Sequence, residues 1–141
     1  MEIDDITHAV IEDSIRIHRD LGPGLMESVY ESVLASSLER RGLKTERQKT
    51  VRFVYDGMTF DEGMRIDLLV ESRLIIELKS VEKLSPVHGK QLLTYLRLMD
   101  LQVGLLINFG SATLKEGLRR VVNQLPASAS SHLRVNRGKI L

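Results

Sequence analysis

Two short apolar runs in the middle of the chain constrain its fold more than any other feature. Residues 64–70 (Met-Arg-Ile-Asp-Leu-Leu-Val) and residues 73–79 (Arg-Leu-Ile-Ile-Glu-Leu-Lys) are rich in branched side chains, and only Glu71-Ser72 separates them. Strand-forming runs joined by so short a connection predict an antiparallel β-hairpin.

This hairpin would bring two carboxylates together. If Val70 pairs with Leu74, Asp67 lies directly opposite Glu77, and side chains so placed have Cβ atoms about 5 Å apart. Lys79 shares their face of the sheet, because side chains alternate along a strand with a period of two.

Carboxylates that face each other on an apolar sheet repel and are costly to desolvate, so they add no stability of their own. A cation would resolve the conflict. The ligands on offer are oxygens, which favours Mg2+ or Mn2+ over zinc. Two alternatives remain open: Lys79 neutralises the pair in a structural ion cluster, or the hairpin has another register and the acids point apart.

The composition indicates one ordinary domain. At 141 residues the chain is long enough for a core of its own. It has no cysteine, which excludes disulfides, thiol nucleophiles and cysteine-based zinc sites. No apolar run approaches the roughly 20 residues that span a membrane, and the acidic start Met-Glu-Ile-Asp-Asp is unlike a signal peptide. We therefore expect a cytoplasmic protein without a membrane segment.

The net charge of +1 conceals an uneven distribution along the chain. Residues 1–31 are acidic, whereas residues 32–60 and the chain from residue 101 onward are basic. The basic residues of these two stretches are Arg40, Arg41, Lys44, Arg47, Lys49, Arg52, Lys115, Arg119, Arg120, Arg134, Arg137 and Lys139. Basic clusters beside an acidic metal site suit nucleic acid, whose phosphates they would hold. The alternative is that they are only solvated faces.

Apolar residues at helical spacing predict four helices. The first runs from Ile6 to about Asp20, before Gly22-Pro23-Gly24. Two more are expected at 87–99, after the Ser85-Pro86 cap, and at 114–122. Another is expected from about Met26 to Arg41, with a buried face of Met26, Val29, Val33, Leu34 and Leu38.

Strands are expected at 45–55 and 58–60, around an Asp56-Gly57 turn, besides the two strands of the central hairpin. The apolar run 103–109 predicts a central strand that is covered on both faces. Residues 1–125 are thus expected to form one α/β domain, a central mixed sheet flanked by helices. Residues 126–141 are expected to form a basic, Ser-rich and flexible tail, in which residues 133–135 could add a short strand.

Two further groups of side chains could bind a substrate or a metal. Gln91 and Tyr95 are four residues apart on one helix face, where they could hold a phosphate or the attacking water. The alternative is an ordinary surface glutamine and a half-buried tyrosine. Gly24, Glu27 and Tyr30 surround the start of a helix, where Glu27 could also be only a favourable charge.

Together these residues resemble the GxxExxY proteins of the PD-(D/E)XK nuclease superfamily, from about Ile6 to Asn123. The resemblance is carried by Gly24-x-x-Glu27-x-x-Tyr30, Arg65-Ile-Asp67-Leu-Leu-Val, Glu77-Leu-Lys79, Gln91-x-x-x-Tyr95 and Gly104-Leu-Leu-Ile-Asn-Phe-Gly110. The chain departs from the superfamily motif at Ile66, where proline is frequent.

The resemblance implies a restriction-endonuclease-like core. It implies that Lys79 orients or activates the attacking water. Gln91 and Tyr95 resemble a pair in RecB-like exonuclease domains, which implies a role in positioning substrate. The Mg2+ ligands that it implies are Asp67, Glu77 and Glu27.

We therefore expect a nuclease that hydrolyses phosphodiester bonds of nucleic acid, with DNA favoured over RNA. The Leu78 carbonyl and Glu27 would complete a Mg2+ or Mn2+ site formed by Asp67 and Glu77. A chain this short has little room for a domain that grips the substrate, so a homodimer or a protein partner would fit. The alternative is a catalytically silent or partner-dependent module that binds nucleic acid or protein on a nuclease fold.

Overall fold

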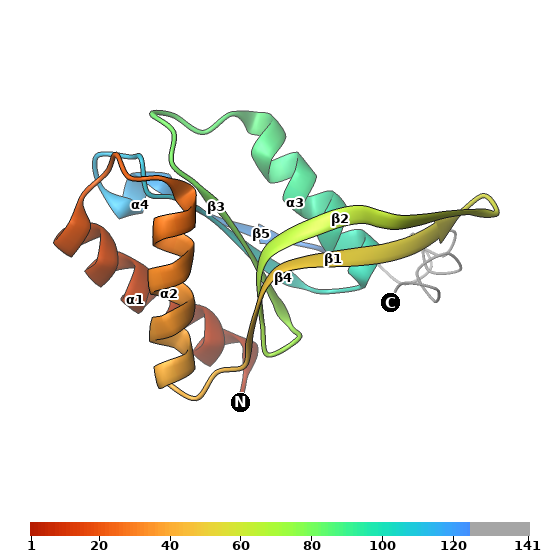
Figure 1. Ribbon diagram of the computed structural model, residues 1–141, viewed down its shortest axis with the longest axis horizontal. Coiled ribbons are helices and arrows are strands. Elements are labelled where there is room, and N and C mark those ends of the chain that lie inside the picture. The colour runs from red at the N-terminus through yellow and green to blue at the C-terminus, as the bar shows by residue number, and fades with distance from the viewer. Residues whose placement is uncertain (125–141) are drawn as a thin grey trace.

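A mixed five-stranded sheet lies between two layers of helices in the computed structural model, which describes residues 1–124 (Figure 1). Its strands lie in the order β1-β2-β3-β4-β5, with β3 and β4 parallel and the other neighbours antiparallel. This confirms the expected fold class. The predicted tail, residues 126–141, lies outside the described residues. The elements are α1 (Ile3–Leu21), α2 (Glu27–Arg40), β1 (Thr45–Tyr55), β2 (Met58–Val70), β3 (Leu74–Lys79), α3 (Pro86–Met99), β4 (Val103–Asn108), α4 (Leu114–Gly117) and β5 (Leu118–Val122).

The helices divide the apolar core into two layers, one on each face of the sheet. α1 and α2 pack on one face, where the buried residues include Ile6, Tyr30, Leu34, Leu68, Ile76 and Leu105. α3 packs on the other face, with Leu92 and Leu96 against Ile66, Ile75 and Leu106. β3 and β4 are buried almost throughout, as expected of central strands that are covered on both sides. The end of β3, where Glu77 and Lys79 lie, is therefore held on both faces.

The buried face of α2 differs from the predicted one. Leu34 and Leu38 are buried as expected, but Met26 and Val29 are 74% and 39% exposed. Met26 is the N-cap residue, so it precedes the helix, and Tyr30 occupies the core position beside Val29. None of the helices in residues 1–124 combines the length and apolar character needed to cross a membrane.

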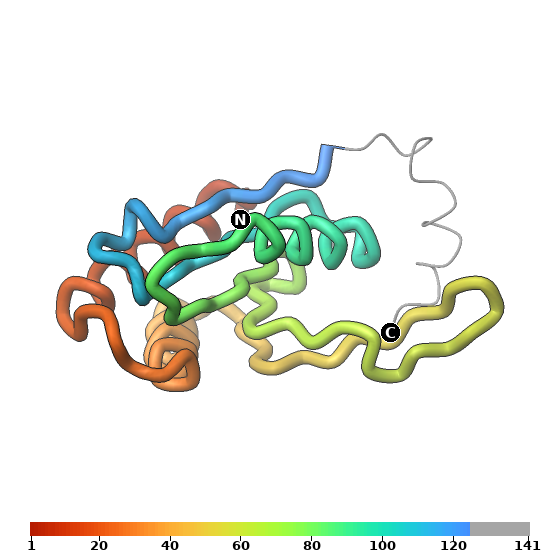
Figure 2. The backbone as a smooth tube through the Cα atoms, turned by 90° about the horizontal axis from the view of Figure 1, so that it is seen from above, coloured from red at the N-terminus to blue at the C-terminus, as the bar shows by residue number. Residues whose placement is uncertain are grey.

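The hairpin of β1 and β2 extends beyond the rest of the sheet as a long arm (Figure 2). Its turn is Asp56-Gly57, as predicted, and both residues have the positive φ angles, 51° and 75°, that a type I′ turn requires. Residues 58–60 and 64–70 were expected as separate strands, but β2 is continuous. Only its last three residues pair with β3, so most of β2 has β1 as its one neighbouring strand.

The prediction of a helix at residues 114–122 was wrong after its first turn. Only Leu114–Gly117 is helical, and Leu118–Val122 forms β5, which pairs antiparallel with β4. Pairing with a central strand outweighs the helical spacing of the apolar residues, and the valines suit a strand. Gly117 also approaches the Asn108 carbonyl so closely that a Cβ atom would lie 2.3 Å from its oxygen.

Candidate active site

The central hairpin has the register that places Asp67 and Glu77 together. Val70 pairs with Leu74, as predicted, and the pairing continues to Leu68 and Ile76. Beyond the pair of Leu68 and Ile76, the Leu78 backbone N–H donates a 2.8 Å hydrogen bond to Oδ2 of the Asp67 side chain. The Asp67 side chain therefore binds β3 at the point where the ladder between β2 and β3 ends.

Glu77 is a buried carboxyl group with an unsatisfied atom. It is 6% exposed, and its Oε1 has no hydrogen-bond partner within the described residues. Burial, followed by the charge of Asp67, raises the pKa of Glu77 from 4.5 to about 9. Without a cation, this carboxyl group therefore stays protonated at neutral pH. A buried oxygen that lacks a partner beside a second carboxylate fits a hard divalent cation.

Lys79 lies two residues beyond Glu77 at the partly buried end of β3. Its charge lowers the pKa of Glu77, although less than burial and Asp67 raise it. No ion pair joins Lys79 to Asp67 or Glu77 within residues 1–124. The alternative in which Lys79 neutralises the two acids directly thus has no support from the geometry.

Glu31 and Gln48 join the site, and sequence reasoning did not find them. Glu31 is 6% exposed on α2, and Gln48 lies on β1. The Gln48 side-chain amide donates to Oε1 of Glu31 and, at 3.2 Å, to Oδ1 of Asp67. The available signal was the spacing of Glu27 and Glu31, which are four residues apart and so share a helix face.

Glu27 lies at the exposed start of α2, as predicted. A pocket of about 310 Å³ is lined by Glu27, Ser28, Glu31, Gln48, Arg65, Asp67 and Leu78. Among residues 1–124, however, no three acidic or histidine side chains converge closely enough to hold a metal ion in this conformation. Glu27 and the Leu78 backbone thus border the pocket without completing a cage around an ion.

The Gly24-x-x-Glu27-x-x-Tyr30 motif shapes the loop that leads into α2. Gly24 has a φ angle of 107°, which favours glycine. The Tyr30 hydroxyl donates to the Gly22 carbonyl at 2.6 Å and accepts from the Leu25 N–H at 3.2 Å. Ser80, just after β3, donates to the Leu25 carbonyl at 2.6 Å. These contacts hold the start of α2 next to the end of β3.

The two predicted residues of α3 have different surroundings. Tyr95 is partly buried in the second apolar layer, and burial followed by the charge of Glu77 raises its pKa. It therefore lies within electrostatic range of the two carboxylates. Gln91 is exposed one turn earlier on the helix. The structure thus brings Tyr95 near Glu77 and leaves Gln91 on the surface.

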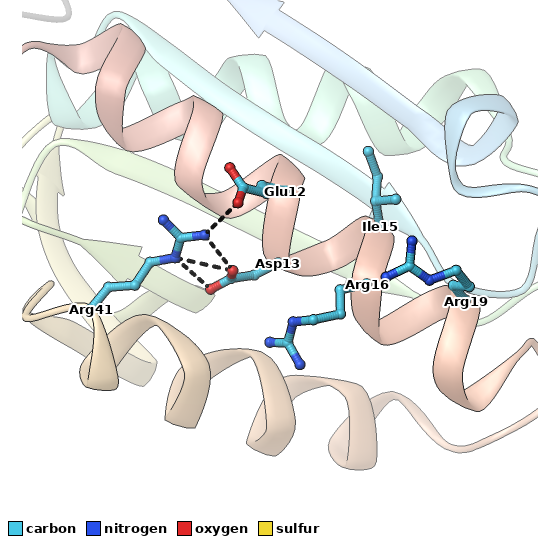
Figure 3. Close-up of a pocket in the computed structure, with 6 residues that line it drawn as sticks. All are labelled: Glu12, Asp13, Ile15, Arg16, Arg19 and Arg41. Carbon is cyan, nitrogen blue, oxygen red and sulfur yellow. Dashed lines mark hydrogen bonds and ion pairs between the residues drawn. The ribbon is translucent and has the colours of Figure 1, made fainter.

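A second pocket, of about 280 Å³, lies between α1 and α2 and contains none of the predicted site residues (Figure 3). Arg41 binds both carboxylate oxygens of Asp13, at 2.7 to 3.0 Å, and also pairs with Glu12. Ser37 donates to Asp13 at 2.6 Å and accepts from Arg16 at 2.7 Å. Because the buried carboxylate is satisfied on every side, this network ties the two helices together.

Comparison with known proteins identifies the family and supports the fold. The profile described as the PD-(D/E)XK nuclease superfamily matches residues 4–121, so the chain belongs to that superfamily. A solved structure titled "Crystal structure of SSO0001" is similar over 94% of this chain and 68% of its own, with a TM-score of 0.52 and 18% identity, which supports the fold alone. No curated protein sequence matches this chain.

Proposed function

We propose that the protein is a nuclease that depends on Mg2+ or Mn2+ and hydrolyses phosphodiester bonds of nucleic acid. DNA is favoured over RNA as its substrate. The observation that carries the proposal is the buried Glu77 carboxyl group, whose Oε1 has no partner although Asp67 lies beside it. Two buried or neighbouring carboxyl groups of this kind destabilise the fold unless a partner or a bound cation offsets the cost, so their presence favours a functional site. Membership of a nuclease superfamily supports the same conclusion.

Asp67 and Glu77 would hold the cation, with Glu27 and the Leu78 carbonyl as further ligands. When bound, the cation would polarise the phosphate and lower the pKa of a water molecule. Lys79 would orient the attacking water or offset charge in the transition state, since it is a compact cation without an ion-pair partner in the site. Tyr95 and Gln91 would position the substrate from α3.

The start of α2 favours the GxxExxY group within the superfamily. Gly24 and Tyr30 hold the loop, and Glu27 is left exposed at the rim of the pocket. We expect a homodimer or a protein partner to supply further contacts with the substrate.

Cleavage by the Lys79→Ala variant tests this proposal. The purified protein with Mn2+ should cleave at least one member of a panel of single- and double-stranded DNA and RNA. Loss of Lys79 should lower the rate by about two orders of magnitude or more, the scale for removing one electrostatic group from a transition state. The variant should still bind Mn2+ in calorimetric titration, whereas Asp67→Asn should not. Undiminished cleavage by Lys79→Ala would contradict the assignment.

The second candidate is a binding module without turnover, or one that needs a partner. It is favoured by one observation: the acidic side chains of the described residues do not converge on a metal position. This candidate predicts an affinity for nucleic acid that falls as the salt concentration rises, and no cleavage with any cation. The panel above separates the two candidates.

A further inference from the structure

Gln48 has a backbone conformation that is unusual for its place in a strand. Its φ angle is 48°, in the left-handed region that residues other than glycine rarely adopt. Arg47 pairs with Leu68 and Lys49 pairs with Ile66, so β1 and β2 keep one register on both sides. The irregularity is therefore confined to Gln48, opposite Asp67.

The Gln48 side chain links two acids of like charge. Its amide nitrogen donates to Oε1 of Glu31 and to Oδ1 of Asp67. Both partners are acceptors, and only the NH2 end of an amide carries donors, so the chemistry fixes the orientation of the group. Gln48 thus acts as a neutral spacer between the carboxylates.

The chain of contacts begins on α2 and ends at Asp67. The other oxygen of Glu31, Oε2, accepts from Arg47 at 3.1 Å, and Arg47 also donates to Ser32 at 2.8 Å. Glu31 is held on both oxygens, and so it fixes the direction of the Gln48 amide. The Leu78 N–H holds the other oxygen of Asp67. Each Asp67 oxygen keeps a further lone pair with which to bind a cation.

We propose that Gln48 is a positioning residue, which aims the Asp67 carboxylate at the cation, and that Glu31 orients the Gln48 amide. The inference rests on the proposed metal-dependent function and assigns a role to two residues that this function had not used. Partners of this kind, which orient a metal ligand, typically change metal affinity or activity about 10- to 100-fold when they are lost.

Two substitutions distinguish the effect of the Gln48 side-chain amide from the effect of its backbone conformation. Gln48→Gly adopts a positive φ angle readily and removes the amide. Gln48→Asn also tolerates this conformation and keeps an amide, but its side chain is one methylene shorter. The matched control is Thr50→Gly, which introduces a glycine at an exposed position of the same strand.

We expect both Gln48 variants to raise the Mn2+ dissociation constant about 10- to 100-fold in calorimetric titration, while Thr50→Gly binds Mn2+ as the wild type does. Equal Mn2+ affinity in Gln48→Gly and the wild type would overturn the inference and leave the proposed function intact. A wild type that binds no Mn2+ would overturn the proposed function, and this inference with it.

An NMR titration of the wild type with Mg2+ tests the same role and does not depend on whether the variants fold. In 15N-correlated NMR spectra, saturation with Mg2+ should shift the Gln48 side-chain NH2 signals, because their acceptor Asp67 becomes a metal ligand. The Gln124 side-chain signals, from an exposed residue beyond β5, should stay in place. Gln48 signals that do not move at saturating Mg2+ would overturn the proposed role.

Discussion

The Tyr30 ring stacks on the Phe109 ring, with centroids 4.4 Å apart and planes inclined by 7°. The contact joins the helix that carries Glu27 to the residue that follows β4, and the Tyr30 hydroxyl holds the loop before that helix. One side chain therefore connects the core to the rim of the candidate site.

Tyr30→Phe should keep the stacking and lose two hydrogen bonds, those to the Gly22 carbonyl and the Leu25 N–H. We expect the free energy of unfolding to fall by about 1–3 kcal/mol, since each of the two bonds contributes about 0.5–1.5 kcal/mol. Urea denaturation measures the change. Tyr55→Phe, on the exposed end of the arm, is the control and should have no measurable effect. A Tyr30→Phe variant as stable as the control would show that the hydroxyl does not anchor the loop.

Glu77→Gln should stabilise the protein at neutral pH when a chelator removes divalent cations. The pKa of Glu77 is raised to about 9 in the folded state, against 4.5 as its ordinary value. Between these pH values the folded state binds the extra proton, so the contribution of Glu77 to wild-type stability is full below about pH 4.5. It falls by up to about 1.4 kcal/mol per pH unit from there to about pH 9, the folded-state pKa. The glutamine lacks this dependence.

Denaturation at several pH values, with chelator and with Mn2+, tests the role of Glu77. Mn2+ should stabilise the wild type by mass action and should have little effect on Glu77→Gln. Parallel pH profiles for the two proteins in chelator would contradict the raised pKa. Equal stabilisation of both by Mn2+ would remove Glu77 from the metal site.

Glu27→Gln should weaken Mn2+ binding with almost no change in stability, because this carboxylate is exposed and borders the pocket. Surface substitutions away from structural contacts change stability by about 0.5 kcal/mol or less. Glu39→Gln, exposed near the other end of α2, is the matched control. Identical Mn2+ titrations of the two variants would exclude Glu27 as a ligand.

Asp13→Asn should loosen the contact between α1 and α2 without changing cleavage. Burial alone would raise the pKa of Asp13, but the hydrogen bonds from Arg41 and Ser37 and the charge of Arg41 outweigh it and lower the pKa below 3.8. This carboxylate therefore stabilises the fold above about pH 3.8, and the contribution disappears as the pH falls through the lower folded-state value. We expect a loss of about 2 kcal/mol at pH 7, the scale of hydrogen bonds to a charged group.

Glu12→Gln provides the control for Asp13, since Glu12 pairs with the same arginine at 3.3 Å but is 67% exposed. It should cost less than about 0.5 kcal/mol, as exposed ion pairs contribute little. Urea denaturation at pH 7 would measure both variants. Equal losses for the two would contradict the importance of the buried carboxylate.

Alternation of side chains in a strand explains why the pair of Asp67 and Glu77 could be predicted. One register buries the apolar residues of both strands, and that register places the acids opposite each other. The contribution of Gln48 could not be predicted, because a left-handed residue within a strand leaves no sequence signal unless it is glycine. β5 was missed because the residues after Leu114 also fit a helical spacing, and only pairing with β4 decides between the two.

The arm formed by β1 and β2 should unfold locally more readily than the rest of the sheet. Residues 58–67 of β2 have backbone hydrogen bonds to only one neighbouring strand, whereas β3 and β4 lie inside the sheet and are buried on both faces. Amide protons near Asp56 should therefore exchange with solvent through local fraying, and those of β4 only when the whole domain unfolds. Asp67 lies at the boundary between these two regimes, so the candidate site is built where the slowly exchanging core meets a segment that opens on its own.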